Sequence, residues 1–332
     1  MANRIESAGI SAQVSDSTAQ TGLPSLPMRA GDLSVADLID LYMAHYAGRD
    51  STRVQRLRWW SAQVGTVRLQ ELSDDHVHAA IEALATQSSR YYAGKDADGR
   101  AIHRAKKKPL APATLNRYAA SLASVVTWAI KKRIAPRGYV HPVRTIERRP
   151  ENNEKLRFLS AAESEALLQA CRSSSWPKLY VLVLMALTTG ARKGELLGLT
   201  WGDIDLPERV AYVGRTKNGQ PRVLPLLPTV VEELERFEAG AASLVFPSRR
   251  NPKTAYSFEP LFHAALKAAH IKAVTFHTLR HTCASSLAKS DATLLEIADV
   301  LGHRQLAMTK RYAHLTTGHK ARLVNRVLGD VR

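Results

Sequence analysis

Five short segments in the second half of the chain combine cationic, imidazole and phenolic side chains. A single Arg, His or Tyr of this kind is more often structural than functional, but together the segments are suited to phosphate chemistry. Arginine binds phosphate oxygens through paired donors, histidine and lysine can move protons, and a tyrosine oxygen can attack phosphorus. The segments are residues 191–195, 216–219, 277–281, 301–303 and 311–312.

His277 and Arg280 are an informative pair, because residues three apart on a helix lie on one face. Their side chains can converge on one phosphate, with Arg280 as a bidentate ligand and His277 as a proton carrier near neutral pH. Arg192 can complete the clamp from another helix. Lys217 lies in a predicted Asn-Gly turn, from which a compact, flexible acid can reach over a substrate.

Tyr312 has the side chain that could become covalently attached. A tyrosine pKa is about 10 in solution, so its phenolate is scarce at neutral pH unless cations stabilise it or a base takes the proton. The Arg, Lys and His residues of the other segments supply both. Because these cations can neutralise a phosphate, we expect no metal and no cofactor, and the sequence contains no carboxylate cluster or Walker-type loop.

The elements that precede this set are predicted to be helices. Ser34 and Ser51 are suited to cap two helices, a third begins near Ser73, and a fourth begins at Pro112, a favoured first-turn residue. Apolar residues recur at helical spacing in each. Residues 33–141 are therefore predicted to form an all-helical domain, and the polar residues 1–32 are predicted to be a disordered tail.

A polar stretch, residues 88–110, is predicted to be a long loop, because it has no core-forming pattern. From Arg90 to Pro150 there are fifteen Lys or Arg residues against three acidic ones, a surplus of twelve out of the net seventeen of the whole chain. A solvated face usually mixes charges of both signs. We therefore expect this stretch to contact phosphate.

Residues 142–159 are rich in Pro and charge, and are predicted to be an interdomain linker. A second domain, residues 160–332, is predicted to begin with helices at 160–172, at 178–189 and from about 191. Residues 210–213 and 222–226 are predicted to be two strands of a hairpin, and residues 313–332 a last helix. The fold class is therefore mainly α with a small β-hairpin or sheet.

The composition limits the classes of partner. With 332 residues, 45% of them hydrophobic, the chain can form about two domains, and a formal charge of +17 favours a polyanion. The longest apolar run, residues 179–187, is too short to span a bilayer and is predicted to be a buried helix. Cys171 and Cys283 are expected to be buried thiols. No secretory signal is recognisable, so we expect a cytoplasmic location.

Along the chain, the residues with chemical potential occur in the order Arg192, Lys217, His277, Arg280, His303 and Tyr312. This order resembles that of the tyrosine recombinase family, which includes phage integrases and Xer recombinases. Residues 277–281 match the family's His-x-x-Arg box, and residues 301–303 match the next box, nine residues before the tyrosine. The resemblance is strong over residues 160–332. More loosely, residues 33–141 resemble the SAM-like core-binding domain of the family.

The resemblance implies a role for each residue. Tyr312 would attack the scissile phosphate to form a 3′-phosphotyrosyl bond, while Arg192 and Arg280 would hold the non-bridging oxygens. Lys217 would protonate the departing 5′-oxygen, and His277 would accept or relay the tyrosine proton. His303 would donate to a phosphate oxygen, and Glu195 would orient its neighbours. Because a phosphotyrosyl bond conserves the energy of the broken bond, no ATP would be required.

The implied partner is duplex DNA with specific recombination sites, bound by a homo-oligomer that is a tetramer on paired sites. The basic residues 106–108 are expected to contact phosphates, and residues 52–58 and 114–117 are candidates for reading bases. The candidate DNA-contacting residues are Arg53, Arg56, Lys106, Lys107, Lys108, Thr114, Asn116 and Arg117.

Several alternatives remain open at this point. Residues 1–32 are too short and polar for the arm-binding domain of many phage integrases, so integration, excision, inversion and dimer resolution all stay open. An integrase of a mobile element is preferred, and a Xer-like resolvase is second. A type IB topoisomerase would share the tyrosine chemistry. A non-catalytic DNA-binding regulator would be expected to lose catalytic side chains, and none is missing. A basic RNA-binding protein would not explain the ordered set.

Overall fold

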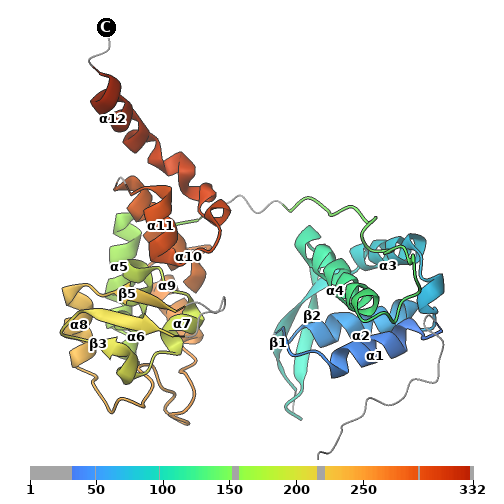
Figure 1. The fold of residues 1–332 in the computed structure, drawn as a ribbon. Helices are drawn as coiled ribbons and strands as arrows, with labels where there is room; N and C mark the ends of the chain where they lie inside the picture. The colour runs from blue at the N-terminus through green and yellow to red at the C-terminus, as the bar shows by residue number, and fades with distance from the viewer. Residues whose placement is uncertain are drawn as a thin grey trace, which may run out of the picture. The chain divides into compact units, whose positions relative to one another are not determined.

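The computed structural model describes residues 32–48, 50–96, 98–151, 157–214, 221–290 and 292–329. The chain divides into two compact units, Met1–Asn152 and Asn153–Arg332. Both are built mainly from helices with small sheets (Figure 1), which confirms the predicted fold class. Over the part of the chain that the structure describes, no helix has the length and apolar character needed to cross a membrane.

The first unit contains four α-helices among its described residues, and three of them begin as predicted. Ser34 and Ser73 accept hydrogen bonds at the starts of α1 and α3, and Pro112 occupies the first turn of α4. The start of α2 differs, because its N-cap is Thr52 rather than Ser51 and makes no side-chain cap. The elements are α1 (Val35–Ala44), α2 (Arg53–Val64), η1 (Leu69–Glu71), α3 (Asp74–Ala85) and α4 (Pro112–Lys131).

The predicted loop at residues 88–110 is wrong, because this segment forms an antiparallel β-hairpin of β1 (Ser88–Lys95) and β2 (Ala101–Pro109). Gly99 adopts a φ of +77°, and an Asp96 carboxylate oxygen accepts a hydrogen bond from the Arg100 N–H at 2.7 Å. These are turn features that the Asp and Gly residues favour. The strands lack apolar alternation, and none of the hairpin side chains that the structure describes belongs to the buried core cluster of this unit.

Both described ends of the predicted linker, residues 142–159, pack into a core. Val143 is buried in the first unit together with Trp60 and Leu122, and Leu159 is buried in the second unit. In addition, the Arg149 guanidinium donates to Glu82 of α3 at 2.6 Å. The segment up to residue 151 is therefore tied to the first unit at Val143 and Arg149, although most side chains between residues 144 and 151 are exposed.

The second unit is built around α6, which is buried along nearly its whole length, as predicted for residues 179–187. Helix α10 packs against α6, and a three-stranded antiparallel sheet has the order β3-β4-β5. The first elements are α5 (Ala161–Arg172), α6 (Lys178–Thr189), α7 (Lys193–Leu197), η2 (Trp201–Asp203), β3 (Ile204–Asp205), β4 (Val210–Val213) and β5 (Arg222–Pro225). The remaining elements are α8 (Pro228–Glu235), α9 (Glu259–Ala268), α10 (Phe276–Lys289), α11 (Leu294–Leu301), η3 (Leu306–Met308), η4 (Lys310–Thr316) and α12 (Thr317–Leu328).

A glycine at the end of α6 allows the central helices to meet. Gly190 has a φ of +60°, and a Cβ at this position would lie 2.5 Å from a methyl carbon of Leu301. The chain can therefore turn sharply into Ala191 and Arg192 while α11 packs close by. Cys171 and Cys283 are both buried free thiols, as predicted.

Candidate active site

Glu195 is the buried centre of a group of arginines in the second unit. One of its carboxylate oxygens accepts a hydrogen bond from Arg192 Nη1 at 2.7 Å, and the other accepts one from Arg222 Nη2 at 2.8 Å. Burial raises the pKa of Glu195, but the hydrogen bond from the Arg192 backbone and the charge of Arg222 outweigh burial, and the net shift is downward. The ionised carboxylate therefore fixes both guanidinium groups. Sequence reasoning did not select Arg222.

Arg280, on α10, is buried with a free donor. Its Nη1 donates to the Gly190 carbonyl at 2.7 Å, whereas its Nη2 is buried and has no hydrogen-bond partner among the described residues. Burial, followed by the charges of Arg192 and Arg222, lowers the pKa of Arg280 to about 10, so it stays charged at neutral pH. A buried, unpaired guanidinium donor is costly unless a ligand uses it. An anion such as phosphate would satisfy it.

His303 lies just after α11, near Arg192 and Arg280. The preceding residue, Gly302, ends the helix with a φ of +64°, and its carbonyl lies 3.5 Å from Arg192 Nη2. His303 Nδ1 is hydrogen-bonded to the Thr309 hydroxyl at 2.8 Å. Burial and the charges of Arg280 and Arg192 lower the pKa of His303 to about 4, so the ring is neutral at pH 7.

Tyr312, in η4, is almost completely buried, with 2% of its surface exposed. It packs against Ala284 and Leu301, and its hydroxyl is 2.6 Å from Nδ1 of His281. Burial raises the pKa of Tyr312, while Arg311 and Arg280 oppose that shift. The hydroxyl is therefore held by an imidazole in a positively charged environment.

His281, rather than the predicted His277, is the histidine that contacts the Tyr312 hydroxyl. His277 is one turn away on α10, is more exposed to solvent, and has its ring centroid 4.8 Å from that of His281. Partial desolvation, followed by Arg280 and Arg192, lowers the pKa of His277. The signal for His281 was present in the sequence, since residues 277 and 281 are spaced four apart and share a helix face.

Lys217 lies outside the described residues, which stop at residue 214 and resume at residue 221. The strands on either side pair in antiparallel fashion, with Val213 opposite Arg222. Arg222 therefore begins β5 and also contacts Glu195, so this hairpin is anchored in the arginine group. No cluster of three or more His, Cys, Asp or Glu side chains within the described ranges is arranged to hold a metal.

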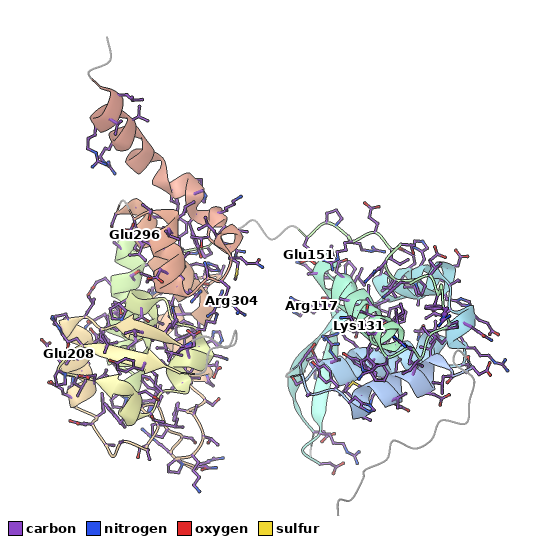
Figure 2. All side chains as sticks on the ribbon, viewed as in Figure 1. Arg117, Lys131, Glu151, Glu208, Glu296 and Arg304 are labelled. Carbon is purple, nitrogen blue, oxygen red and sulfur yellow. The ribbon has the colours of Figure 1, made fainter. Side chains whose placement is uncertain are left out.

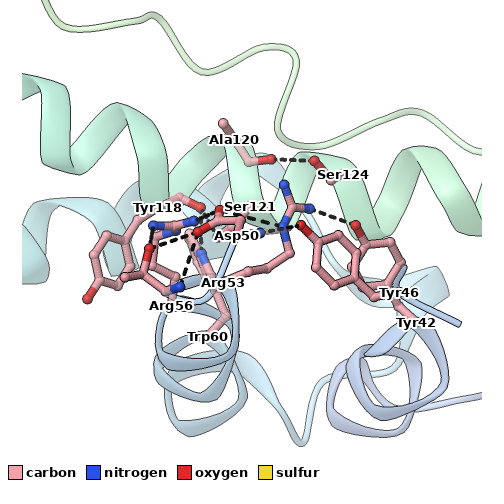
Figure 3. A network of polar contacts seen from close by, with 11 residues as sticks. Tyr42, Tyr46, Asp50, Arg53, Arg56, Trp60, Tyr118, Ala120, Ser121 and Ser124 are labelled. Carbon is pink, nitrogen blue, oxygen red and sulfur yellow. Dashed lines mark hydrogen bonds and ion pairs between the residues drawn. The ribbon is translucent and has the colours of Figure 1, made fainter. Parts of the chain in front are cut away.

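The first unit carries a second arginine cluster at the start of α2 (Figure 3). The Arg56 guanidinium is paired with the Asp50 carboxylate, and Arg53 Nη1 donates to the Tyr42 hydroxyl at 2.6 Å. The Nε atoms of Arg53 and Arg56 are buried without hydrogen-bond partners in the described part of the chain. The cluster borders a hollow of about 390 Å³, which is lined by Asp50, Thr52, Arg53, Arg56, Arg117, Ala120, Ser121 and Ser124.

The other candidate DNA-contacting residues differ in availability. Figure 2 shows Arg117 on α4, where its side chain is exposed, whereas Asn116 donates to the Arg149 carbonyl at 2.9 Å and is engaged within the unit. Thr114 lies in the first turn of α4. Lys106 and Lys108 are exposed on β2, and the side chain of Lys107 lies outside the described part. Three of the predicted arginines thus meet at one hollow, and the lysines lie on the hairpin.

Comparison with known proteins gives a consistent picture. Residues 157–319 match the model of the phage integrase family. The type 1 fimbriae regulatory protein FimE of Escherichia coli K12 is 33% identical over 169 residues, which are 48% of this chain and 85% of FimE. The shufflon-specific DNA recombinase of Escherichia coli is 32% identical, over 53% of this chain and 44% of its own length. The integrase of Salmonella phage P22 is 24% identical over 86% of this chain and 77% of its own.

Two solved structures share the fold. The Tn1549 transposon integrase, in complex with a circular intermediate DNA, has a TM-score of 0.67 at 20% identity and covers 89% of this chain and 100% of its own. The structure of lambda integrase (its residues 75–356), a dimer bound to a core site, has a TM-score of 0.61 at 19% identity. The match covers 83% of this chain and 97% of the lambda integrase chain.

Proposed function

The chain belongs to the phage integrase family of tyrosine recombinases, and from this premise we propose that it cuts and rejoins duplex DNA at specific sites through Tyr312. Members of this family are enzymes that break and rejoin DNA. The chain spans only 44% of the length of the shufflon recombinase, although it spans 85% of FimE. The activity of this chain is therefore proposed from the residues of its candidate active site.

A single observation supports the proposal most strongly. Arg280 presents an unpaired buried donor in a group that also contains Arg192, His303 and Tyr312, although these residues come from separate elements of the second unit. The side chains that we propose as phosphate ligands and the tyrosine that we propose as the nucleophile are therefore next to each other. This arrangement favours phosphoryl transfer over passive DNA binding, which needs no buried tyrosine hydroxyl.

The chemistry follows from the positions of the side chains. Arg192 and Arg280 bind the two non-bridging oxygens of the scissile phosphate and stabilise the charge that develops on them. His303, with Nδ1 on Thr309, donates from its other nitrogen to a phosphate oxygen. The Tyr312 oxygen attacks phosphorus and the 5′-oxygen departs, protonated by Lys217. Attack by a 5′-hydroxyl on the phosphotyrosine reverses these steps and rejoins the strand.

The partner that we propose is duplex DNA, contacted by both units. The hollow of the first unit combines Arg53, Arg56 and Arg117 with one carboxylate, and this surplus of positive charge suits a backbone phosphate. We propose further that the chain acts as a tetramer on paired sites, since solved lambda integrase structures include a dimer on a core site and a tetramer on a Holliday junction.

The biological role that we favour is integration and excision of a mobile element. The P22 phage integrase and the Tn1549 transposon integrase are both similar to most of this chain. Resolution by a Xer-like enzyme is the alternative.

The proposal is tested by trapping the covalent intermediate. A duplex sequence is first selected from a random pool by binding to the full chain, and then a nick is placed near its centre. Wild-type protein is expected to form a denaturation-resistant adduct without metal or ATP, whereas Tyr312→Phe binds the duplex and forms none. If wild type binds but yields no adduct, the chain is a regulator. An adduct with both proteins would show that another nucleophile acts. Exchange between two labelled sites then separates a recombinase from a topoisomerase.

A further inference from the structure

We propose that His281 is a catalytic residue that takes the proton from the Tyr312 hydroxyl as its oxygen attacks phosphorus. The inference rests on the proposed function and deepens it, because it assigns the proton transfer to a residue outside the predicted set. The observation behind it is the 2.6 Å distance between the Tyr312 oxygen and Nδ1 of His281. A general base must lie within hydrogen-bonding distance of the proton that it removes, and His281 meets that requirement.

Burial and nearby positive charge keep the His281 ring neutral, the form that can accept a proton. Burial, followed by the charges of His277 on the same helix, Arg311 from η4 and Arg280, lowers the pKa of His281 to about 4. The ring is thus neutral at pH 7. In the tautomer protonated on Nε2, the lone pair of Nδ1 points at the Tyr312 hydroxyl.

The same cations favour the deprotonated tyrosine. Tyr312 faces Arg311, Arg280 and the Cys283 thiol, in addition to His281. A phenolate beside two guanidinium groups is stabilised by their charge, even though burial alone opposes ionisation. Proton transfer to His281 therefore forms an anion at a place where positive charge is already arranged.

His277 is better placed to pass the proton on than to receive it first. Exposure increases from buried Tyr312 through partly buried His281 to exposed His277, and the two imidazole rings meet edge to face. The order of exposure defines a route from the hydroxyl to solvent. His277 would then act second, after His281.

The proposed step balances. The O–H bond of Tyr312 breaks and its proton goes to Nδ1 of His281, while the tyrosine oxygen forms a bond to phosphorus. The bond from phosphorus to the 5′-oxygen breaks, and Lys217 protonates that oxygen. The imidazolium that forms on His281 is balanced by the negative charge of the bound phosphate. In rejoining, His281 returns the proton to the departing tyrosine oxygen, and Lys217 takes one from the attacking 5′-hydroxyl.

The test compares single-turnover adduct formation on the nicked, selected duplex between pH 6 and pH 10. His281→Asn keeps an acceptor near the position of Nδ1 but cannot take a proton. We expect it to react about 100-fold more slowly than wild type at pH 7, with a rate that increases with pH as hydroxide replaces the base. Wild type should vary little over this range. His263→Asn, a change at an exposed histidine on α9, is the matched control and should behave as wild type.

A second variant separates catalysis from folding. His281→Ala, which removes the ring, should regain part of its rate when imidazole is added, whereas a misfolded protein would not. Three results would overturn the inference. The first is that His281→Asn matches wild type in both rate and pH profile, and the second is that only His277→Asn changes the pH profile. The third is that His281→Ala reacts faster than wild type, which would mean that His281 restrains Tyr312. Because wild type and Tyr312→Phe are assayed together, failure of the proposed function appears separately, as no adduct with wild type.

Discussion

At the scale of single residues, Glu195 determines how Arg192, which is proposed to bind phosphate, and the neighbouring Arg222 are held. Its side chain is 3% exposed and is shared between Arg192 and Arg222, whose side chains are 21% and 10% exposed. A buried charge without a partner is strongly unfavourable, so each member depends on the others. The carboxylate orients Arg192 through both its side chain and its backbone N–H. Glu195 is therefore a positioning residue for Arg192.

Replacement of Glu195 by Gln is expected to destabilise the chain by about 3 kcal/mol, because two partly buried guanidinium groups lose the counter-charge of a buried carboxylate. The free energy of unfolding from urea denaturation measures the effect. The pKa of Glu195 is lower in the folded state than in the unfolded state, where it is about 4.3. The ionised carboxylate therefore stabilises the fold above a pH of about 4.3, and this stabilisation is lost as the pH falls through the pKa of the folded state. The difference in the free energy of unfolding between Glu195→Gln and wild type should therefore become smaller at acidic pH.

Glu259→Gln provides the control, because Glu259 pairs with Lys193 at the surface, where the side chains are 42% and 51% exposed. Exposed pairs contribute about 1 kcal/mol or less. If Glu195→Gln were no more destabilising than Glu259→Gln, the view of Glu195 as the anchor of the arginine group would be wrong.

At the scale of elements, the end of α11 brings His303 into the site. Gly302 adopts a left-handed conformation there, and a Cβ at this position would lie 2.8 Å from Cδ of Arg222. Arg222 Nη1 also donates to the Val300 carbonyl at 2.6 Å, so β5 is tied to the helix end. The glycine thus permits both the turn and the close approach of an arginine.

Gly302→Ala is expected to slow adduct formation by between about tenfold and 100-fold, because His303 and Arg222 must shift. It should also reduce stability by more than the roughly 1 kcal/mol that a left-handed alanine costs. Gly138→Ala is the matched control, since Gly138 has a φ of +77° but no atom within 4 Å of an added Cβ. Equal adduct rates for the two variants would contradict a specific role for the helix end.

The hairpin of β1 and β2 illustrates an element that contributes charge rather than core. Its ends are joined by a hydrogen bond from the Leu110 N–H to the Gln87 carbonyl at 3.2 Å. It therefore projects from the first unit without interrupting the helices around it.

At the scale of the whole molecule, the surplus of positive charge is concentrated in one part of the sequence. Residues 90–150 hold fifteen of the 47 Lys and Arg residues but only three of the 30 acidic ones. Binding to a polyanion through such residues releases counterions and weakens as salt rises.

The triple variant Lys106→Gln, Lys107→Gln and Lys108→Gln is expected to bind duplex DNA more weakly and with a shallower dependence on salt. The slope of log affinity against log salt should fall by up to about 3, or one for each lost phosphate contact. Fluorescence anisotropy with a labelled duplex at several salt concentrations measures it. The corresponding triple change to Arg keeps the charge and should keep the slope. An unchanged slope in the Gln variant would exclude Lys106, Lys107 and Lys108 as phosphate contacts.

The sequence alone determined the family, the order of the residues proposed to bind phosphate and most of the helices. These features are local, because caps, helical spacing and short motifs depend on neighbouring residues. For this reason the starts of α1, α3 and α4 and the placement of His277 and Arg280 on one helix were predictable. The hairpin at residues 88–110 was not, because its strands lack the apolar alternation that marks a strand with one buried face.

The tertiary structure alone decided which side chains meet. The sharing of Glu195 by two arginines and the contact of Arg222 with Gly302 depend on helices and strands far apart in the chain. The choice of His281 over His277 as the partner of Tyr312 depends on the rotation of α10 relative to η4. Spacing places both histidines on one face of the helix, but only packing against a second element determines which of them reaches the hydroxyl.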